Sequence, residues 1–265
     1  LVRQIRLIDL GETDWWRTQT VYHALAERMR ADSADAIVIC RPAQPYLCLG
    51  YHQLFDAVFE REQCRQLNLP VIRRRLGGGA TYLDRNQVFY QFIFHHSRVP
   101  VMPEQMYAKF LAMPVAALLK CGIAAQLVGL NEIEVGERRI AGIGGGNIGE
   151  ASVVVGNFLF DFDYEKMARV WRVPHRAFEK MAARSLRHRI VTLRELDPKL
   201  TFENVQKNLI AACHTAFGPA LKADTLSDAE ANYAEKMYRK MVSLDFLNLH
   251  APNCSAKPMA SLKIS

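Results

Sequence analysis

The rest of this sequence is organised around one stretch, Val71-Ile72-Arg73-Arg74-Arg75-Leu76-Gly77-Gly78-Gly79-Ala80. Three consecutive glycines give up side-chain packing and cost folding entropy, so they mark a turn or a close backbone approach. Three arginines beside them add fixed positive charge and planar donor groups. The stretch therefore indicates a cradle for a phosphate or carboxylate, held by backbone N–H groups and guanidinium groups. A glycine hairpin beside a solvated basic patch is the alternative.

The composition is that of an ordinary globular protein. The 265 residues are 50% hydrophobic and 23% charged, which suits one large domain or one domain with a small appendage. No apolar run approaches the ~20 residues that a membrane span needs. The first residues lack the long apolar region of a signal peptide, so a cytoplasmic location is the expectation.

Charge and cysteine spacing exclude several classes of function. The net charge of +7 favours an anionic substrate or an acidic partner. No nucleic-acid-binding module is recognisable, so neither a nucleic acid nor a membrane is expected as a partner. None of the six cysteines has C-x-x-C spacing, which removes the usual signature of zinc and thioredoxin-type chemistry.

Hydrophobic periodicity predicts an α+β fold of mixed, largely antiparallel sheets flanked by helices. Helices are expected at 15–29, 55–67, 102–119 (kinked at Pro114), 164–171, 202–217 and 229–244. Strands are expected at 3–9, 36–40, 46–50, 70–72, 88–94, 125–130, 133–135, 139–143, 152–162 and 260–265. Gly136-Glu137 supplies a hairpin turn. Residues 144–149 are expected to form a second glycine-rich loop.

Four segments, in order, resemble the lipoate-protein ligase family, which shares its fold with biotin ligases and octanoyltransferases. The matching segments are Arg73-Arg74-x-x-Gly77-Gly78-Gly79-Ala80, Asn131-Glu132-Ile133 with Gly136 and Ile140-Ala141-Gly142, 161–174 ending in Val173-Pro174, and 184–193. The resemblance covers roughly residues 1–220.

The resemblance implies an ATP-dependent reaction in two steps. Lipoate attacks the α-phosphorus of ATP to give lipoyl-AMP, and a lysine of a lipoyl-type acceptor protein then attacks the acyl-adenylate. The implied binding residues are Arg73, Arg74, Gly77, Gly78, Gly79, Ala80, Asp84, Asn131, Ile140, Ala141 and Gly142. Arg74 would contact the anionic head, and Asp84 is the candidate ligand for Mg²⁺.

The sequence departs from the family pattern at three places. The family's catalytic lysine falls on Arg139, which keeps the charge but cannot release a proton near neutral pH. Leu83, Asn86 and Gln87 occupy the His, Gly and Asn positions that usually follow the first glycines. The second triple glycine, 144–146, replaces small and polar residues.

Two alternatives to a ligase follow from these departures. One is an ATP-independent octanoyl or lipoyl transferase that works through a cysteine thioester. Residues 142–178 contain no cysteine, which leaves only remote thiols such as Cys48 or Cys213 as the nucleophile. The other is a non-catalytic protein that binds a lipoyl group or acyl-adenylate. The sequence leaves open whether lipoate, octanoate or biotin is bound.

The domain organisation implied by the resemblance is a catalytic domain over residues 1–225. Residues 226–265 form a helix and tail that are too short for the accessory domain common in the family, so a separate small accessory subunit is a hypothesis. The basic balance fits a lipoyl-domain or H-protein-like acceptor with an acidic surface.

Overall fold

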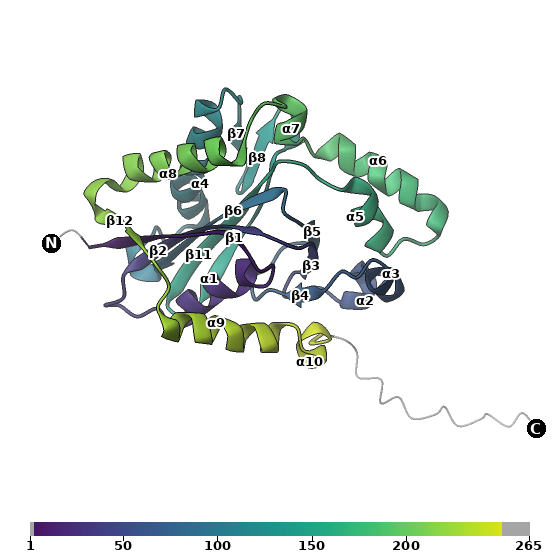
Figure 1. Cartoon of the computed structure of the whole chain (residues 1–265), viewed down its shortest axis with the longest axis horizontal. Coiled ribbons are helices and arrows are strands. Elements are labelled where there is room, and N and C mark those ends of the chain that lie inside the picture. Colours follow the sequence, from purple (N-terminus) through teal and green to yellow (C-terminus); the bar gives the residue numbers. More distant parts are fainter. Residues whose placement is uncertain (1–2, 251–265) are drawn as a thin grey trace, which may run out of the picture.

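A six-stranded mixed sheet forms the centre of the computed structural model, which describes residues 3–250 (Figure 1). In sheet order, its strands are β10 (Ala141–Ile148), β11 (Ala151–Leu159), β6 (Gln87–His95), β2 (Asp35–Pro42), β1 (Ile5–Thr13) and β12 (Leu221–Asp224). Strands β2, β1 and β12 run parallel, whereas β2, β6, β11 and β10 pair antiparallel. The predicted α+β class is confirmed.

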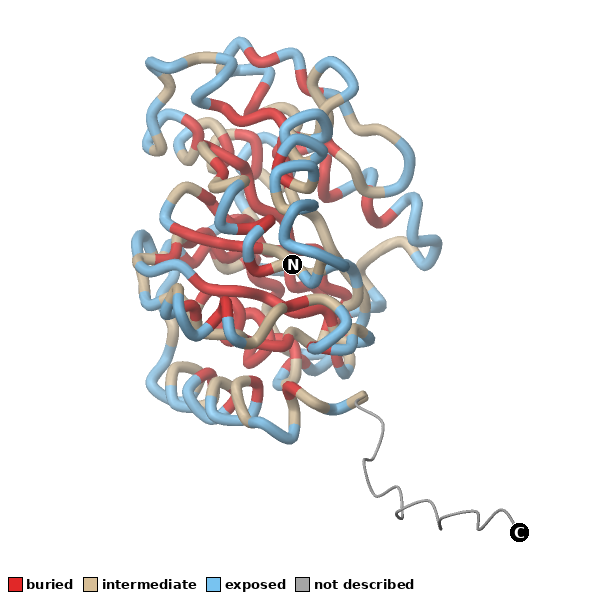
Figure 2. Tube along the Cα trace, turned by 90° about the vertical axis from the view of Figure 1, so that its right-hand side faces the viewer, coloured by how far each residue is buried: buried red, intermediate tan, exposed pale blue. Residues whose placement is uncertain are grey.

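Helices cover both faces of this sheet. One face packs against α4 (Pro103–Lys120) and α8 (Phe202–Phe217), and the other packs against α1 (Arg17–Glu27) and α9 (Asp228–Met241). Successive strand residues point to opposite faces: Ile37 and Ile39 contribute to the core under α4 and α8, while Val38 contributes to the core under α1. Figure 2 shows that the buried residues follow the strands and that exposed residues lie on the outer turns of the helices.

Two smaller sheets flank the central one. The first contains β4 (Val71–Arg73), β3 (Tyr46–Leu49) and β5 (Thr81–Leu83), and the second contains β7 (Gln126–Val128), β8 (Glu132–Val135) and β9 (Arg138–Arg139). The first triple glycine lies in the irregular connection from β4 to β5. Gly136 and Glu137 both have positive φ, 54° and 65°, and make the predicted hairpin turn between β8 and β9.

The remaining helices are short. They are α2 (Phe55–Val58), α3 (Arg61–Gln66), α5 (Tyr164–Val170), α6 (Glu179–Arg189), α7 (Leu193–Leu196) and α10 (Leu244–Leu247). Helices α5 and α6 lie together at the right of Figure 1, and α9 and α10 run along its lower edge. No helix in residues 3–250 is long and apolar enough to cross a membrane.

The predicted loop at 144–149 is wrong over most of its length. Residues 144–148 belong to β10, where Gly144, Gly145 and Gly146 pair with residues of β11 in an unbroken antiparallel register. Glycines disfavour strands, but β11 offers a run of buried valines as a partner edge, and the neighbours of β10 leave little room for side chains. Tertiary packing therefore outweighs local propensity here.

Other predictions were wrong in detail. The helix expected at 55–67 is interrupted, because Phe59 is fully buried and forms an isolated bridge with Trp171. The strand expected at 139–143 is divided at Ile140, and β12 was not predicted. Helix α4 continues on both sides of Pro114. The strand expected at 260–265 lies outside the described residues.

Candidate functional site

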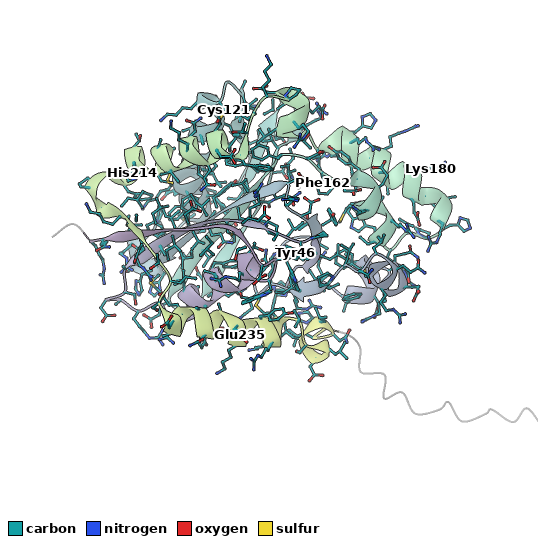
Figure 3. All side chains as sticks on the ribbon, viewed as in Figure 1. Tyr46, Cys121, Phe162, Lys180, His214 and Glu235 are labelled. Atoms are coloured by element: carbon teal, nitrogen blue, oxygen red, sulfur yellow. The ribbon has the colours of Figure 1, made fainter. Side chains whose placement is uncertain are left out.

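A cavity of about 440 Å³ lies between the β4–β5 connection and strands β10 and β11, with α5 and α6 beside it. Its buried wall residues are Gln19, Tyr22, Cys48, Leu76, Leu83, Phe89 and Val155. Its more accessible wall includes Glu132, Glu134, Glu137, Arg139, Trp171, Ser185, Leu186, Arg189 and Ile190. Figure 3 labels Phe162, another residue of the wall. The cavity therefore combines a mainly apolar interior with a charged mouth.

Arg74 brings a positive charge to this cavity without a negative partner. Its Nε and Nη2 donate to the Gly77 carbonyl at 3.1 and 2.7 Å, and Nη2 also donates to the Gly79 carbonyl at 2.8 Å. Its Nη1 lies 3.5 Å from Cys48 Sγ. Among the described residues, no ion pair includes Arg74. A largely enclosed guanidinium without a carboxylate is a site for an anion.

Arg73 points away from the cavity and is fully buried. Its Nη1 donates to the carbonyls of Gly50, Tyr51 and Gln53, and its Nη2 donates to the carbonyl of Leu247 at 2.6 Å. Consecutive residues of an extended chain point to opposite sides. The two signature arginines therefore have different surroundings: Arg74 lines the cavity and Arg73 ties backbone segments together.

The backbone of the first triple glycine requires glycine at one position in particular. Gly78 has φ +92°, and a Cβ there would lie 2.9 Å from Arg74 Nη2. The carbonyl of Gly78 also approaches Gly50 so closely that a Cβ on Gly50 would lie 2.0 Å from it. By contrast, Gly79 lines the cavity with nothing within 4 Å of a Cβ. The connection is thus tightly packed behind and open toward the cavity.

The second triple glycine also has two kinds of environment. A Cβ on Gly145 would lie 2.6 Å from the Tyr107 hydroxyl, and a Cβ on Gly142 would lie 2.8 Å from Asn157 Oδ1. Gly144 lines the cavity, and the nearest atom to a Cβ there is the Gly77 carbonyl oxygen at 3.9 Å. Nothing in the protein itself requires glycine at position 144, so the space is available to a ligand.

His23 anchors the β4–β5 connection to α1. It is fully buried, its Nδ1 bonds the Gln19 carbonyl, and its Nε2 accepts from the Arg75 backbone N–H at 3.0 Å. Burial lowers the pKa of His23 to about 3, because the charged form would lose hydration and face two arginines. The imidazole is therefore neutral, which allows Nε2 to accept that hydrogen bond.

Arg139 lies at the cavity mouth, where its guanidinium forms an ion pair with Glu132. Both side chains are partly exposed. The neighbouring Arg138 pairs instead with Glu195 at 2.8 Å and does not line the cavity. Residue 139 can therefore reach a ligand in the cavity once its interaction with Glu132 is exchanged.

The other residues predicted for the site occupy various positions. Ala80 and Gly142 line the cavity, whereas Gly77, Gly78, Asp84, Asn131, Ile140 and Ala141 do not. Ile140 and Ala141 are fully buried. The Asp84 carboxylate accepts from the Asn86 backbone N–H at 2.8 Å, and burial raises the pKa of Asp84. No group of three or more His, Cys, Asp or Glu side chains in residues 3–250 could hold a metal ion.

Several lining residues were not predicted from the sequence. Gln19 and Tyr22 reach the cavity from α1, where Gln19 Nε2 donates to the Tyr46 hydroxyl at 2.8 Å. Asn157 lies on β11 opposite Gly142. Polar residues three apart on an otherwise apolar helix face were the available signal for Gln19 and Tyr22, but that pattern did not identify which strand they face.

Of the two thiols considered as nucleophiles, Cys48 lines the cavity and Cys213 is buried in the core under α4 and α8. Burial raises the pKa of Cys48, although nearby Arg74 opposes that effect. Since the thiolate is the reactive form, Cys48 is poorly suited to form a thioester.

Comparisons with known proteins agree with this geometry. The family model for the lipoyl protein ligase A/B catalytic domain matches residues 16–214. The lipoate-protein ligase LplJ of Bacillus subtilis is 26% identical over 175 residues, which are 63% of this chain and 50% of that protein. The chain thus spans about half the length of this relative.

Solved structures share the fold. A bipartite lipoate protein ligase from Thermoplasma acidophilum, described with its E2 lipoyl domain, superimposes with a TM-score of 0.84 at 19% identity, covering 95% of this chain and 99% of that one. Lipoate-protein ligase A bound with ATP superimposes with a TM-score of 0.76 at 17% identity, covering 93% and 98%. With its family model matched over residues 16–214, the chain belongs to the family of the lipoyl protein ligase A/B catalytic domain.

Proposed function

We propose that this chain is the catalytic part of a lipoate-protein ligase, which uses ATP to convert lipoate into lipoyl-AMP and transfers the lipoyl group to a lysine of an acceptor protein. The observation that carries the proposal is Arg74, a largely enclosed cation without a carboxylate partner beside an apolar cavity. Residues 1–225 would form the catalytic domain.

The cavity offers what each part of the substrate needs. The apolar interior between Val155 and Leu76 would take the acyl chain, and Arg74 would bind the carboxylate or the phosphate of the adenylate. Both chemical steps build negative charge, so fixed donors in a water-poor site stabilise their transition states. Gly79 and Gly144 would leave room for the ligand between the two segments.

The adenylate would lie toward the mouth, between Arg139 and α6. Arginine stays protonated, so Arg139 would act as a phosphate donor group and not as a base. ATP would displace Glu132 from its ion pair with Arg139. Mg²⁺ would arrive on the phosphates of ATP, because Mg²⁺ keeps several water ligands and needs only one or two protein carboxylates.

The test is pyrophosphate release from Mg-ATP in the presence of lipoate, octanoate or biotin, with Arg139→Lys and Arg139→Ala beside the wild type. We expect release that depends on lipoate, a retained signal in Arg139→Lys and a strong loss in Arg139→Ala. Absence of release together with acyl transfer from a carrier protein would replace the ligase with a transferase. Lipoate binding without either reaction would make the chain a binding protein.

The acceptor would dock on the exposed face of α6. This helix contributes Ser185 and Leu186 to the cavity wall, while Lys180 and Arg184 are exposed (Figure 3). An acidic lipoyl-type domain would be attracted to this surface, mainly through the association rate.

Salt and matched charge variants test this docking surface. The KM for the acceptor should rise with ionic strength. It should also rise in a Lys180→Gln/Arg184→Gln variant but not in Lys207→Gln/Lys222→Gln, which removes the same charge from exposed positions elsewhere. Equal effects of the two double variants would contradict the proposed surface.

A separate accessory subunit is part of the proposal. The bipartite ligase of Thermoplasma acidophilum supports it, because its chain is covered almost completely by this one. We expect weak adenylation by the isolated chain and recovery when a second small protein is added. Full activity of the isolated chain would contradict this.

A further inference from the structure

The three consecutive arginines divide into one that faces the cavity and two that do not. Arg74 lines the cavity, whereas Arg73 and Arg75 make their contacts on its other side. Both of these outer contacts lead to the same part of the chain, residues 228–247, which we call the α9–α10 segment.

The first contact is the buried junction between Arg73 and the end of α10. The Arg73 guanidinium donates to three carbonyls of residues 50–53 and to the Leu247 carbonyl, which is the last one of α10. Carbonyls at a helix end have no partner within the helix. Since Arg73 is inaccessible to water, neither side of this junction can replace the other with solvent.

The second contact runs through α1. Arg75 forms an ion pair with Glu27, and Glu27 also accepts a hydrogen bond from the Tyr233 hydroxyl of α9 at 2.7 Å. The Glu27 side chain is largely buried, which strengthens both interactions. Arg75 is therefore held by α9 through one shared carboxylate.

Apolar packing between these two contacts makes the α9–α10 segment a continuous support. Met237 and Met241 of α9 pack in one cluster with Ile72 of β4 and Cys48 of β3. The ring of Tyr238 stacks on Trp16 with the centroids 4.9 Å apart. The segment thus contacts β4 directly before the glycine connection begins.

We propose that the α9–α10 segment sets the conformation of the β4–β5 connection through Arg73 and through the Tyr233–Glu27–Arg75 chain. Arg73 and Tyr233 are then positioning residues, because they fix Arg74 between them without reaching the cavity. The expected effect on the reaction rests on the proposed function, whereas the effect on the connection itself does not.

Hydrogen exchange of peptides covering residues 74–83 tests the proposal without any substrate. Tyr233→Phe removes only the hydroxyl that bonds Glu27, and Tyr238→Phe is the matched control because no hydrogen bond of its hydroxyl is recorded. We expect exchange roughly tenfold faster in Tyr233→Phe, from the loss of a hydrogen bond to a charged group. Arg73→Lys should give at least the same increase, and Tyr238→Phe none.

Kinetics of lipoate-dependent pyrophosphate release provide the second measurement. The KM for lipoate should rise several-fold in Tyr233→Phe with kcat within about twofold, since Arg74 is misplaced and not removed. Unchanged exchange at 74–83 in both Tyr233→Phe and Arg73→Lys would overturn the proposal. If even the wild type releases no pyrophosphate, the proposed function fails while the exchange pattern still decides this inference.

Discussion

The two triple glycines lie against each other, yet they need glycine for different reasons. A Cβ on Gly144 would lie 3.9 Å from the Gly77 carbonyl, and a Cβ on Gly146 would lie 3.5 Å from Leu76. The first segment is irregular and has a positive φ at Gly78, whereas the second is a regular strand. The same three letters thus satisfy a backbone constraint in one place and a space constraint in the other.

This difference separates the charge of the site from its shape. The first segment surrounds Arg74 with carbonyl groups, which fixes the position of the cation. The second segment contributes no charge and leaves an open wall at Gly144. Variants in the first segment should therefore act on anion binding, and variants in the second should act on packing or on ligand size.

The largest effect is expected for Arg74→Met. Removing one partner of an enclosed charge pair costs about 2–5 kcal/mol, so lipoate-dependent pyrophosphate release should fall in kcat/KM by at least roughly 30-fold. Arg138→Met is the control, because Arg138 pairs with Glu195 outside the cavity. A comparable loss in both variants would mean that overall charge, and not the cradle, is responsible.

Neighbouring glycines of the second segment should separate stability from function. Gly145→Ala forces a methyl group against the Tyr107 hydroxyl and should reduce the free energy of unfolding by about 1–3 kcal/mol. Gly144→Val should unfold at nearly the wild-type temperature but raise the KM for lipoate about tenfold, because its side chain enters the cavity. Denaturation and steady-state kinetics of both variants test this.

The opposite assignment of these two effects would break the comparison. If Gly144→Val were the less stable protein and Gly145→Ala the one with the higher KM, the ligand would lie on the α4 side of β10.

The sequence motif was sufficient to predict the fold and the role of the first segment. Arg74, Gly79 and Ala80 were predicted at the site and all line the cavity. The second segment was mistaken for a loop, because three glycines carry no signal for the eight-residue pairing with β11. Strand pairing depends on residues distant in sequence, which local patterns do not reveal.

The remaining lining residues could not be predicted for a related reason. Gln19 and Tyr22 reach the cavity only because α1 crosses one face of the central sheet. The motif also gave Arg73 the same role as Arg74, although the alternation of an extended chain turns the two side chains apart. A motif identifies which residues matter but not on which side of the backbone each one acts.

Acid should weaken the anchor of the first segment. The pKa of His23 is about 3 when folded and 6.5 ordinarily, so the unfolded chain binds a proton first as the pH falls. Stability from this group is complete above pH 6.5 and is lost between pH 6.5 and 3, at up to ~1.4 kcal/mol per pH unit.

A His23→Gln variant isolates that contribution, since glutamine can donate and accept in similar directions without titrating. The difference in unfolding free energy between wild type and variant should shrink as the pH is lowered from 7 to 4. A difference that stays constant with pH would show that His23 is not held neutral.

The smallest effect is expected at the ion pair that precedes the second segment. Glu132→Gln should change the free energy of unfolding by less than about 1 kcal/mol, because the pair is partly exposed. It should nevertheless lower the KM for ATP a few-fold, since Glu132 competes with phosphate for Arg139. An increased KM would assign Glu132 to substrate binding instead.

A crystal structure with saturating lipoate tests the central claim most directly. The account predicts that the carboxylate lies about 2.7–3.1 Å from a guanidinium nitrogen of Arg74, with the acyl chain along the wall formed by Gly144 and Val155. A carboxylate bound at Arg139, or a ligand outside the cavity between the two glycine segments, would contradict it.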